Sequence, residues 1–325
     1  MLNPMALSDL PWPKLIKPLE MAQVALARLD QALSDNPSAI MKAWLSRMRV
    51  KEAVASAFME GYGATEEKLL FIEADSAIEI IQPDDRYAFG LLRASRAVED
   101  YQLRSRFHPD ILHKFLGAIE GRGFDPESIY EGDAAQDAAL RLAELLDDWT
   151  DAVRKESWPM LPALATLTQR LGQVEAPYCD GALRRLLLPY VAMHIGATRQ
   201  PILMISHRLS QPSSRYKPGA VGPEATLIFL NAVAATAGYG LDHLTALNRQ
   251  RERWRQKCGP RRGHSRLCAA ADLALGAQVV SGKVLVERLG VSPRGATMII
   301  NELVAVGVIR EISGRSRFRL YEGTP

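Results

Sequence analysis

Apolar side chains recur at steps of three and four residues along most of the chain, which is the spacing of one face of an α-helix. The clearest runs are Ala22, Leu26, Leu29 and Leu33 and, further on, Leu142, Leu145, Leu146 and Trp149. Strand-like alternation of apolar and polar residues is scarce before the C-terminal end. Clusters of Pro and Gly interrupt the helical pattern at residues 11–18, 119–126, 175–181 and 210–222. The pattern predicts a mainly α-helical body built of helices of ordinary length.

The C-terminal end has the spacing of a helix-turn-helix. Residues 267–275 and 282–289 predict two helices, and Gly290 supplies the left-handed conformation that ends the second. A third helix follows directly, because Ser292 is a favoured N-cap and Pro293 suits the first helical position, where no backbone N–H is needed. The short connection predicts that the second and third helices form the motif.

The third helix has an apolar stripe on one side and polar residues on the other. The residues predicted to face the core are Ala296, Ile299, Ile300, Leu303 and Val304. The residues predicted to contact DNA are Ser292, Arg294, Thr297, Met298 and Asn301. Arg294 can pair with guanine and Asn301 with adenine through two hydrogen bonds each, while Ser292 and Thr297 suit a phosphate or a base.

A β-hairpin with a basic tip is predicted after the third helix. Apolar and polar residues alternate from Val308 to Ile312, and a second strand-like run extends from Arg317 to Tyr321. The residues predicted to reach phosphates or a minor groove are Arg315, Arg317 and Arg319. Charges on a small hairpin also prevent aggregation at its edge, and small winged domains also serve as protein-binding modules. The basic composition favours DNA binding.

Charge is distributed unevenly along the chain. The formal net charge is +3, yet residues 249–325 contain 15 Lys and Arg against 6 Asp and Glu, while residues 1–248 contain 25 against 31. A basic tail on an acidic body favours a nucleic acid as partner. The densest basic segment, residues 248–266, marks a predicted domain boundary. Its part from Arg249 to Lys257 fits a solvated helix face and a phosphate-binding face equally well.

Several classes of protein are disfavoured by the sequence. No apolar stretch approaches the roughly 20 residues that span a bilayer, and the first ten residues lack the pattern of a secretory signal. The three cysteines, Cys179, Cys258 and Cys268, form no disulfide framework and fit a reducing compartment. The group formed by Cys258, His264 and Cys268 is too small for a zinc signature, so we expect no metal and no cofactor.

The sequence VKEAVASAFMEGYGATEEKLL at residues 50–70 resembles the N-terminal segment of Fic-domain proteins. In that family a Ser or Thr is followed, after three intervening residues, by Glu-Gly or Glu-Asn. The matching residues here are Ser56, Glu60 and Gly61. Residues 161–181, 201–206 and 224–257 are also similar to later parts of the family. The resemblance implies a helical Fic-like fold, in which Glu60 pairs with a signature arginine or faces solvent.

The family signature, His-Pro-Phe-x-Asp-Gly-Asn-Gly-Arg-x-x-Arg, is broken in this chain. Its matches are Ala176, Pro177, Tyr178, Asp180, Gly181, Arg184 and, with a deletion, Arg185. In the family the histidine is the general base, and the loop holds the phosphates of ATP at a helix N-terminus. Alanine cannot accept a proton, and losing a positioned base lowers a rate by about 10² to 10⁴. The resemblance therefore implies a catalytically degenerate body with no catalytic residues.

These patterns predict three domains: a helical Fic-associated region at residues 1–110, a degenerate Fic-like helical core at 111–257 and a winged helix-turn-helix at 258–325. The leading hypothesis is a transcriptional regulator that binds double-stranded DNA as a homodimer, with a body that serves dimerisation or ligand sensing. The alternatives are a protein AMP-transferase and an antitoxin-like module that binds a protein partner. We expect a cytoplasmic protein of a bacterial cell, associated with the nucleoid when DNA-bound and without a membrane partner.

Overall fold

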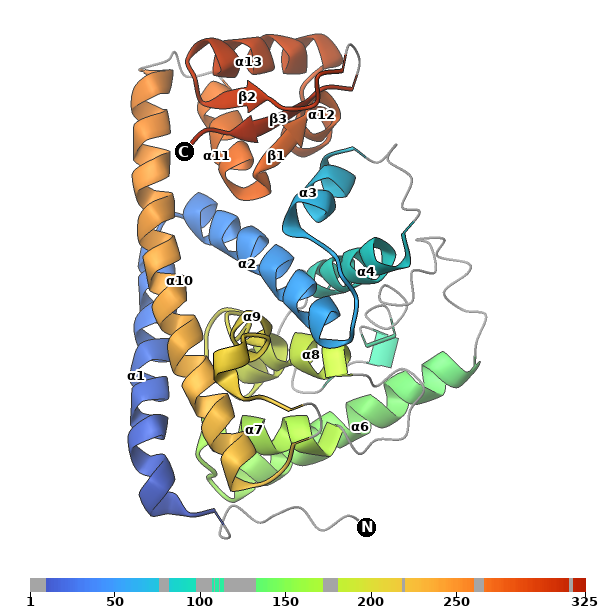
Figure 1. The fold of residues 1–325 in the computed structure, drawn as a ribbon, viewed down its shortest axis with the longest axis vertical. Helices are drawn as coiled ribbons and strands as arrows, with labels where there is room; N and C mark the ends of the chain where they lie inside the picture. Colours follow the sequence, from blue (N-terminus) through green and yellow to red (C-terminus); the bar gives the residue numbers. More distant parts are fainter. Residues whose placement is uncertain are drawn as a thin grey trace. The chain divides into compact units, whose positions relative to one another are not determined.

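The computed structural model describes residues 10–75, 82–97, 107, 109–110, 112–113, 133–171, 181–217, 220–259, 266–315 and 318–325. Helices make up most of the described chain, and its strands lie near the C-terminus (Figure 1). The predicted mainly α-helical class with a C-terminal hairpin is thereby confirmed. Among the described residues, no helix combines the length and apolar composition needed to cross a bilayer.

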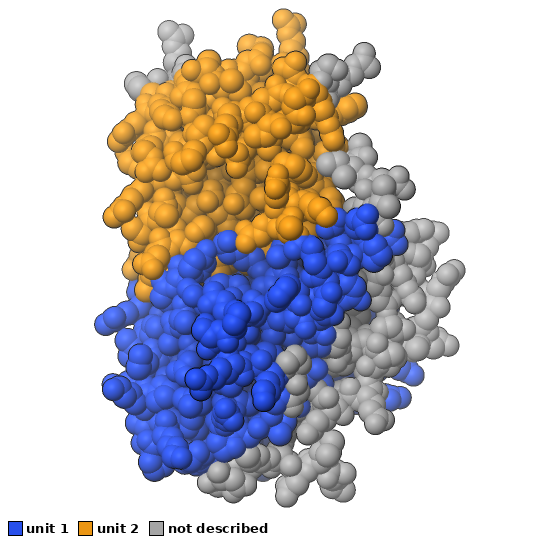
Figure 2. Space-filling model, viewed as in Figure 1, with its two compact units in different colours: residues 1–31, 51–64, 82–239 blue, residues 32–50, 65–81, 240–325 orange. Residues whose placement is uncertain are grey.

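The chain forms two compact units that share its sequence in alternating pieces (Figure 2). Unit 1 consists of residues 1–31, 51–64 and 82–239, and unit 2 of residues 32–50, 65–81 and 240–325. The divisions at residues 31 and 50 fall inside helices α1 and α2, and the division at residue 239 falls inside α10. The three domains predicted from the sequence are consecutive ranges, whereas these units are discontinuous in sequence. The predicted domain ranges stay a prediction.

Unit 1 is built of helices. Its elements, some of which continue into unit 2, are α1 (Trp12–Asp35), α2 (Ser38–Met59), α4 (Pro83–Ala97), α6 (Asp133–Lys155), α7 (Met160–Leu171), α8 (Gly181–His194), α9 (Ser206–Leu209), the 3-10 helix η3 (Pro212–Ser214) and α10 (Pro223–Cys258). Helix α8 packs against α4 and α7 and is buried on nearly all sides, which explains its continuous apolar sequence. Leu26, Leu142 and Trp149, which belong to the apolar runs at helical spacing, are buried in this unit.

Unit 2 adds a short helix and a compact C-terminal fold to the shared helices. Its remaining elements are α3 (Glu66–Ala74), α11 (Leu267–Ala277), β1 (Val279–Ser281), α12 (Gly282–Leu289), α13 (Pro293–Ala305), β2 (Ile309–Glu311) and β3 (Leu320–Gly323). The strands form one antiparallel sheet in the order β1-β3-β2, with Val280 opposite Tyr321 and Arg310 opposite Glu322. The sequence predicted the β2–β3 hairpin and missed β1, because three residues are too few for a recognisable alternation.

The end of α10 is fixed to the C-terminal fold within unit 2. Trp254 is almost fully buried, and its Nε1 donates a hydrogen bond to the carbonyl oxygen of Thr324 at 3.1 Å. Gln250 donates to the same carbonyl at 2.8 Å. Gly323 lies against the indole ring, where a Cβ atom would come within 2.6 Å of a ring carbon. A side chain at Gly323 therefore cannot fit unless the ring or β3 moves.

We expect Gly323→Ala to destabilise the protein by about 1–3 kcal/mol, because overpacking against a rigid ring forces the strand or the ring to shift. The matched control is Gly238→Ala in α10, where a Cβ atom meets nothing within 4 Å. Alanine favours a helix over glycine by about 1 kcal/mol, so the control should be neutral or stabilising. Thermal unfolding followed by circular dichroism measures both variants. Equal melting temperatures for the two would contradict the tight packing at Trp254.

Candidate nucleic-acid interface and the buried polar network

The start of α13 has the capping that its sequence predicts. Gly290 ends α12 with a φ of 64°, the left-handed conformation. The Oγ of Ser292 then accepts a hydrogen bond from the backbone N–H of Gly295 at 3.1 Å, and Pro293 occupies the first helical position. The described helices α12 and α13 are thus joined by a three-residue connection, and the predicted helix-turn-helix is confirmed.

All five residues of α13 and its N-cap that were predicted to contact DNA are exposed. Arg294 has no hydrogen-bond or ion-pair partner among the described residues, and the apolar side chain of Met298 is 65% exposed. The hydroxyl of Thr297 donates to the carbonyl of Pro293 at 3.1 Å, which leaves its oxygen as an acceptor. The polar side of α13 is therefore available to a partner, although its base contacts stay a prediction.

The opposite side of α13 is the core face, with one correction. Ala296, Ile300 and Leu303 are buried, and Ile299 is partly buried, as predicted. Val304 is 40% exposed, so its predicted core position is wrong. Because successive residues turn by about 100°, Val304 lies about 80° around the helix from Ala296 and falls at the margin of the apolar stripe.

The wing arginines that the structure describes are paired within unit 2. Arg315 lies 3.1 Å from the carboxylate of Asp75, and Arg319 lies 3.5 Å from that of Glu311. Arg317, the third predicted wing residue, lies outside the described residues. The predicted role of these arginines in DNA binding is untested. A phosphate would have to compete for Arg315 and Arg319 with carboxylates of the same unit.

Several basic residues at the end of α10 contact other residues of unit 2. The sequence analysis had considered only a solvated face and a phosphate-binding face for this segment. Arg251 forms two hydrogen bonds of 2.7 and 2.8 Å with Asp272 of α11, and Arg255 lies 3.4 Å from the same carboxylate. Lys257 donates to the carbonyl of Gly307 at 2.7 Å, just beyond α13. These cations hold α10 to the C-terminal fold. Arg249 and Arg253 are exposed, and neither has a partner in the described part of the chain.

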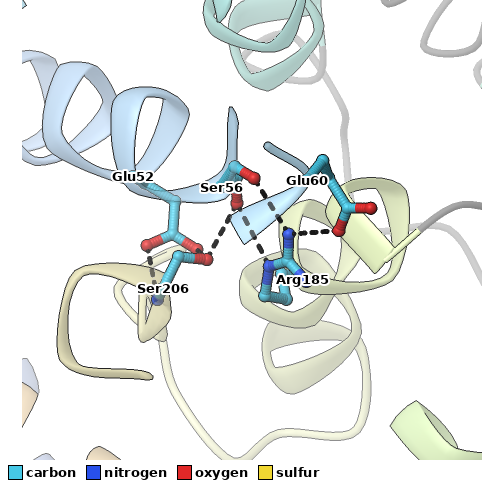
Figure 3. Close-up of polar contacts among 5 residues, drawn as sticks. All are labelled: Glu52, Ser56, Glu60, Arg185 and Ser206. Atoms are coloured by element: carbon cyan, nitrogen blue, oxygen red, sulfur yellow. Dashed lines mark hydrogen bonds and ion pairs between the residues drawn. The ribbon is translucent and has the colours of Figure 1, made fainter. Parts of the chain in front are cut away.

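The body contains a buried polar network around Arg185 of α8 (Figure 3). The side chain of Arg185 is only 4% exposed, and its terminal nitrogen lies 2.8 Å from Oε1 of Glu60. The same nitrogen donates to the carbonyl of Ser56 at 3.1 Å, and Nε lies 3.4 Å from the Ser56 hydroxyl. The pairing of Glu60 with an arginine, one of two outcomes left open by the sequence, is therefore the one that the structure has, and Arg185 is its partner.

The network continues from Ser56 to Glu52, one turn earlier in α2. The two hydroxyls of Ser56 and Ser206 lie 2.8 Å apart. Glu52 accepts hydrogen bonds from the backbone N–H of Ser206 at 2.8 Å and from its hydroxyl at 2.5 Å. If Arg185 donates to Ser56, Ser56 to Ser206 and Ser206 to Glu52, both hydroxyl protons have an acceptor, with the cation of Arg185 at one end and the carboxyl group of Glu52 at the other.

Burial raises the pKa of Glu52 to about 7, although the hydrogen bonds from Ser206 and the positive charge of Arg185 act in the opposite direction. Glu52 and Ser206 were not identified from the sequence. The available signal was the four-residue spacing of Glu52, Ser56 and Glu60, which places Glu52 and Ser56 on one side of α2 and Glu60 directly after its end.

A pocket of about 180 Å³ adjoins the network within unit 1. Gly181, Arg184 and Arg185 from the start of α8 line one part, and apolar side chains such as Leu188, Ile205 and Phe229 line another. A Cβ atom at Gly181 would collide with Oε1 of Glu60, so this position requires glycine.

The other residues matched to the Fic pattern have the following places. Gly61 has a φ of 91° in the turn after α2, a conformation that favours glycine. Ala176, Pro177, Tyr178 and Asp180 lie outside the described residues. Within the described part of the chain, no group of three His, Cys, Asp or Glu side chains could hold a metal ion, and neither Cys258 nor Cys268 forms a disulfide.

The fold and exposed face of residues 267–321 define a winged helix-turn-helix, and this segment matches the family model of the HTH DNA binding domain. The chain is therefore a DNA-binding protein. It is also similar to the solved structure of a Fic family protein from Desulfovibrio desulfuricans G20, with a TM-score of 0.46 and 16% sequence identity over 96% of this chain and 96% of that chain. No curated protein matches the chain.

The raised pKa of Glu52 predicts how stability depends on pH. Between about pH 4.5 and 7 the folded chain binds the Glu52 proton more tightly than the unfolded chain, so this group's contribution to stability is lost as pH rises through that window. Burial lowers the pKa of His207 from 6.5 to about 4, which acts in the opposite direction over nearly the same pH range and is common to wild type and variant. Glu52→Gln removes the Glu52 titration alone.

We expect the free energy of unfolding of Glu52→Gln to improve relative to wild type as pH rises from about 5 to about 8. Urea unfolding at each pH, followed by tryptophan fluorescence, gives the comparison. Glu20→Gln, in an exposed part of α1, controls for the loss of one carboxylate. Parallel pH curves for wild type and Glu52→Gln would show that Glu52 is not held protonated by burial.

Proposed function

We propose that this protein regulates transcription by placing α13 in the major groove of an operator. The observation that carries this proposal is the exposed polar side of α13, with Arg294 unpartnered among the described residues and Asn301 two turns further on. Arginine and asparagine are the side chains that pair with guanine and adenine through two hydrogen bonds. In this proposal α13 supplies sequence recognition, and the rest of unit 2 orients it.

The body, in the same proposal, is a catalytically inactive Fic-like module. Two features support this function. Glu60 pairs with Arg185, one of the two outcomes that the resemblance implies for this glutamate, and the position of the family's general base is Ala176. A body without a general base retains a pocket and a set of helical surfaces, which suit ligand sensing, dimerisation or binding of a protein partner.

A homodimer is part of the proposal, because two copies of α13 reading two half-sites multiply the specificity of one. A cytoplasmic address, with association with the nucleoid in a bacterial cell, accompanies DNA binding. An antitoxin-like module that only binds proteins is the competing hypothesis, and DNA binding through α13 is the property that separates the two.

The first test is fluorescence anisotropy of the full chain with labelled duplexes selected from a random-sequence library. We expect Arg294→Ala and Asn301→Ala each to cost about 1–3 kcal/mol of discrimination between selected and random duplexes, because each removes a two-bonded base contact. Arg28→Ala removes an exposed cation from α1 and serves as the control. Equal affinity of all four proteins for the selected duplex would exclude α13 as the reading element.

Catalytic inactivity has its own test. Incubation of the full chain with ATP labelled in its α-phosphate and with a bacterial lysate should transfer no label to protein, because Ala176 offers no base for a target hydroxyl. Arg185→Ala is the matched control, since it removes the cation beside the pocket. Label that is incorporated by wild type and lost in Arg185→Ala would favour the AMP-transferase.

A further inference from the structure

Asp75 ends the short helix α3 and is tied to the winged fold of unit 2. Its backbone N–H donates to the carbonyl of Phe71 at 3.0 Å, which closes the last turn of α3. The neighbouring carbonyl of Ala74 accepts a hydrogen bond from the hydroxyl of Ser281 at 2.7 Å, and α3 packs against β1. The backbone at Asp75 is therefore fixed beside the sheet that carries the wing.

The carboxylate of Asp75 holds a wing arginine. Its Oδ2 lies 3.1 Å from a terminal nitrogen of Arg315, and the exposed fractions of the two side chains are 9% and 50%. The carbonyl of Arg315 accepts a hydrogen bond from Nε of Arg319 at 3.0 Å, and Arg319 also pairs with Glu311. The backbone and the guanidinium of Arg315 are both engaged inside the unit.

The difference in exposure decides which group depends on the pair. Asp75 has lost most of its hydration, so the arginine stabilises its charge strongly, whereas the half-exposed Arg315 still has contact with water. A DNA phosphate that took Arg315 would leave a mostly buried carboxylate without this partner. That penalty opposes the transfer of Arg315 from Asp75 to DNA.

We propose that Asp75 is a positioning residue for DNA binding, which acts through Arg315 and keeps this arginine away from DNA phosphates. The proposal rests on DNA binding by the winged fold. It means that Asp75, at the end of α3, determines how many wing arginines can contact DNA phosphates. In the wild type, Arg315 makes no phosphate contact. When Asp75 is replaced by an uncharged residue, Arg315 becomes available for a phosphate contact.

The experiment measures the affinity of the full chain for a labelled mixed-sequence duplex across a series of salt concentrations. Each phosphate neutralised by a protein cation adds about −0.9 to the slope of log K against log salt for duplex DNA. We expect Asp75→Asn to make the slope more negative by about this amount and to bind more tightly at low salt. Arg315→Ala should leave the wild-type slope unchanged, and the double variant should lose the gain.

Two comparisons keep the outcome specific. Glu67→Gln removes one negative charge from an exposed position of α3 in the same unit and should leave the slope unchanged, which excludes an effect of net charge. If Asp75→Asn does not fold, Arg315→Ala still decides: a slope that becomes less negative by about 0.9 would show that Arg315 already contacts a phosphate and would overturn the proposal. An unchanged slope in folded Asp75→Asn would also overturn it. Absence of wild-type binding at low salt would instead refute DNA binding itself.

Discussion

The buried charge of Arg185 is the constraint on which the centre of the body depends. Arginine cannot lose its proton at any pH that a protein tolerates, so a guanidinium that is 4% exposed must find acceptors or destabilise the fold. Glu60 and the carbonyl of Ser56 supply them. The requirement extends to Gly181, because any side chain there would displace the carboxylate that Arg185 needs. Glu60 and the small residue Gly181 are thus both explained by one buried cation.

Helix α2 contributes contacts to each of the two units. Its residues 51–59 belong to unit 1, where Ser56 contacts Arg185, and its residues 38–50 belong to unit 2. In unit 2, Trp44 donates to the carbonyl of Gly240 at 2.9 Å, and Arg47 donates to that of Leu275 in α11 at 2.8 Å. The two parts of this helix therefore supply contacts inside each unit.

The sequence predicted well where local rules decide the structure. The end of α12 and the start of α13 follow from Gly290, Ser292 and Pro293, whose conformational preferences do not depend on distant residues. Prediction was weaker where partners far apart in sequence decide. Arg315 and Asp75 are 240 residues apart and Arg185 and Ser56 are 129 apart, so no spacing rule could pair them. The prediction for Val304 was wrong for a local reason, because periodicity alone does not define how wide the buried part of an apolar stripe is.

The charges of the C-terminal end also depend on partners that the sequence does not reveal. Those partners change what the surplus of basic residues means for DNA binding. A surplus of basic residues favours DNA as a partner, yet Arg251, Lys257 and Arg315 all bind groups of their own unit. Cations that are neutralised by a carboxylate release few counterions from DNA, so the count of basic residues overstates the electrostatic part of binding.

The cations of unit 2 that keep no partner among the described residues include Arg249, Arg253, Arg288 and Arg294. Of these, Arg294 lies on the exposed side of α13, next to the uncharged polar and apolar side chains of Thr297, Met298 and Asn301. In the proposed complex with DNA, the described part of α13 offers one such cation beside several side chains suited to base edges, so its contribution depends more on the base sequence than on the phosphates.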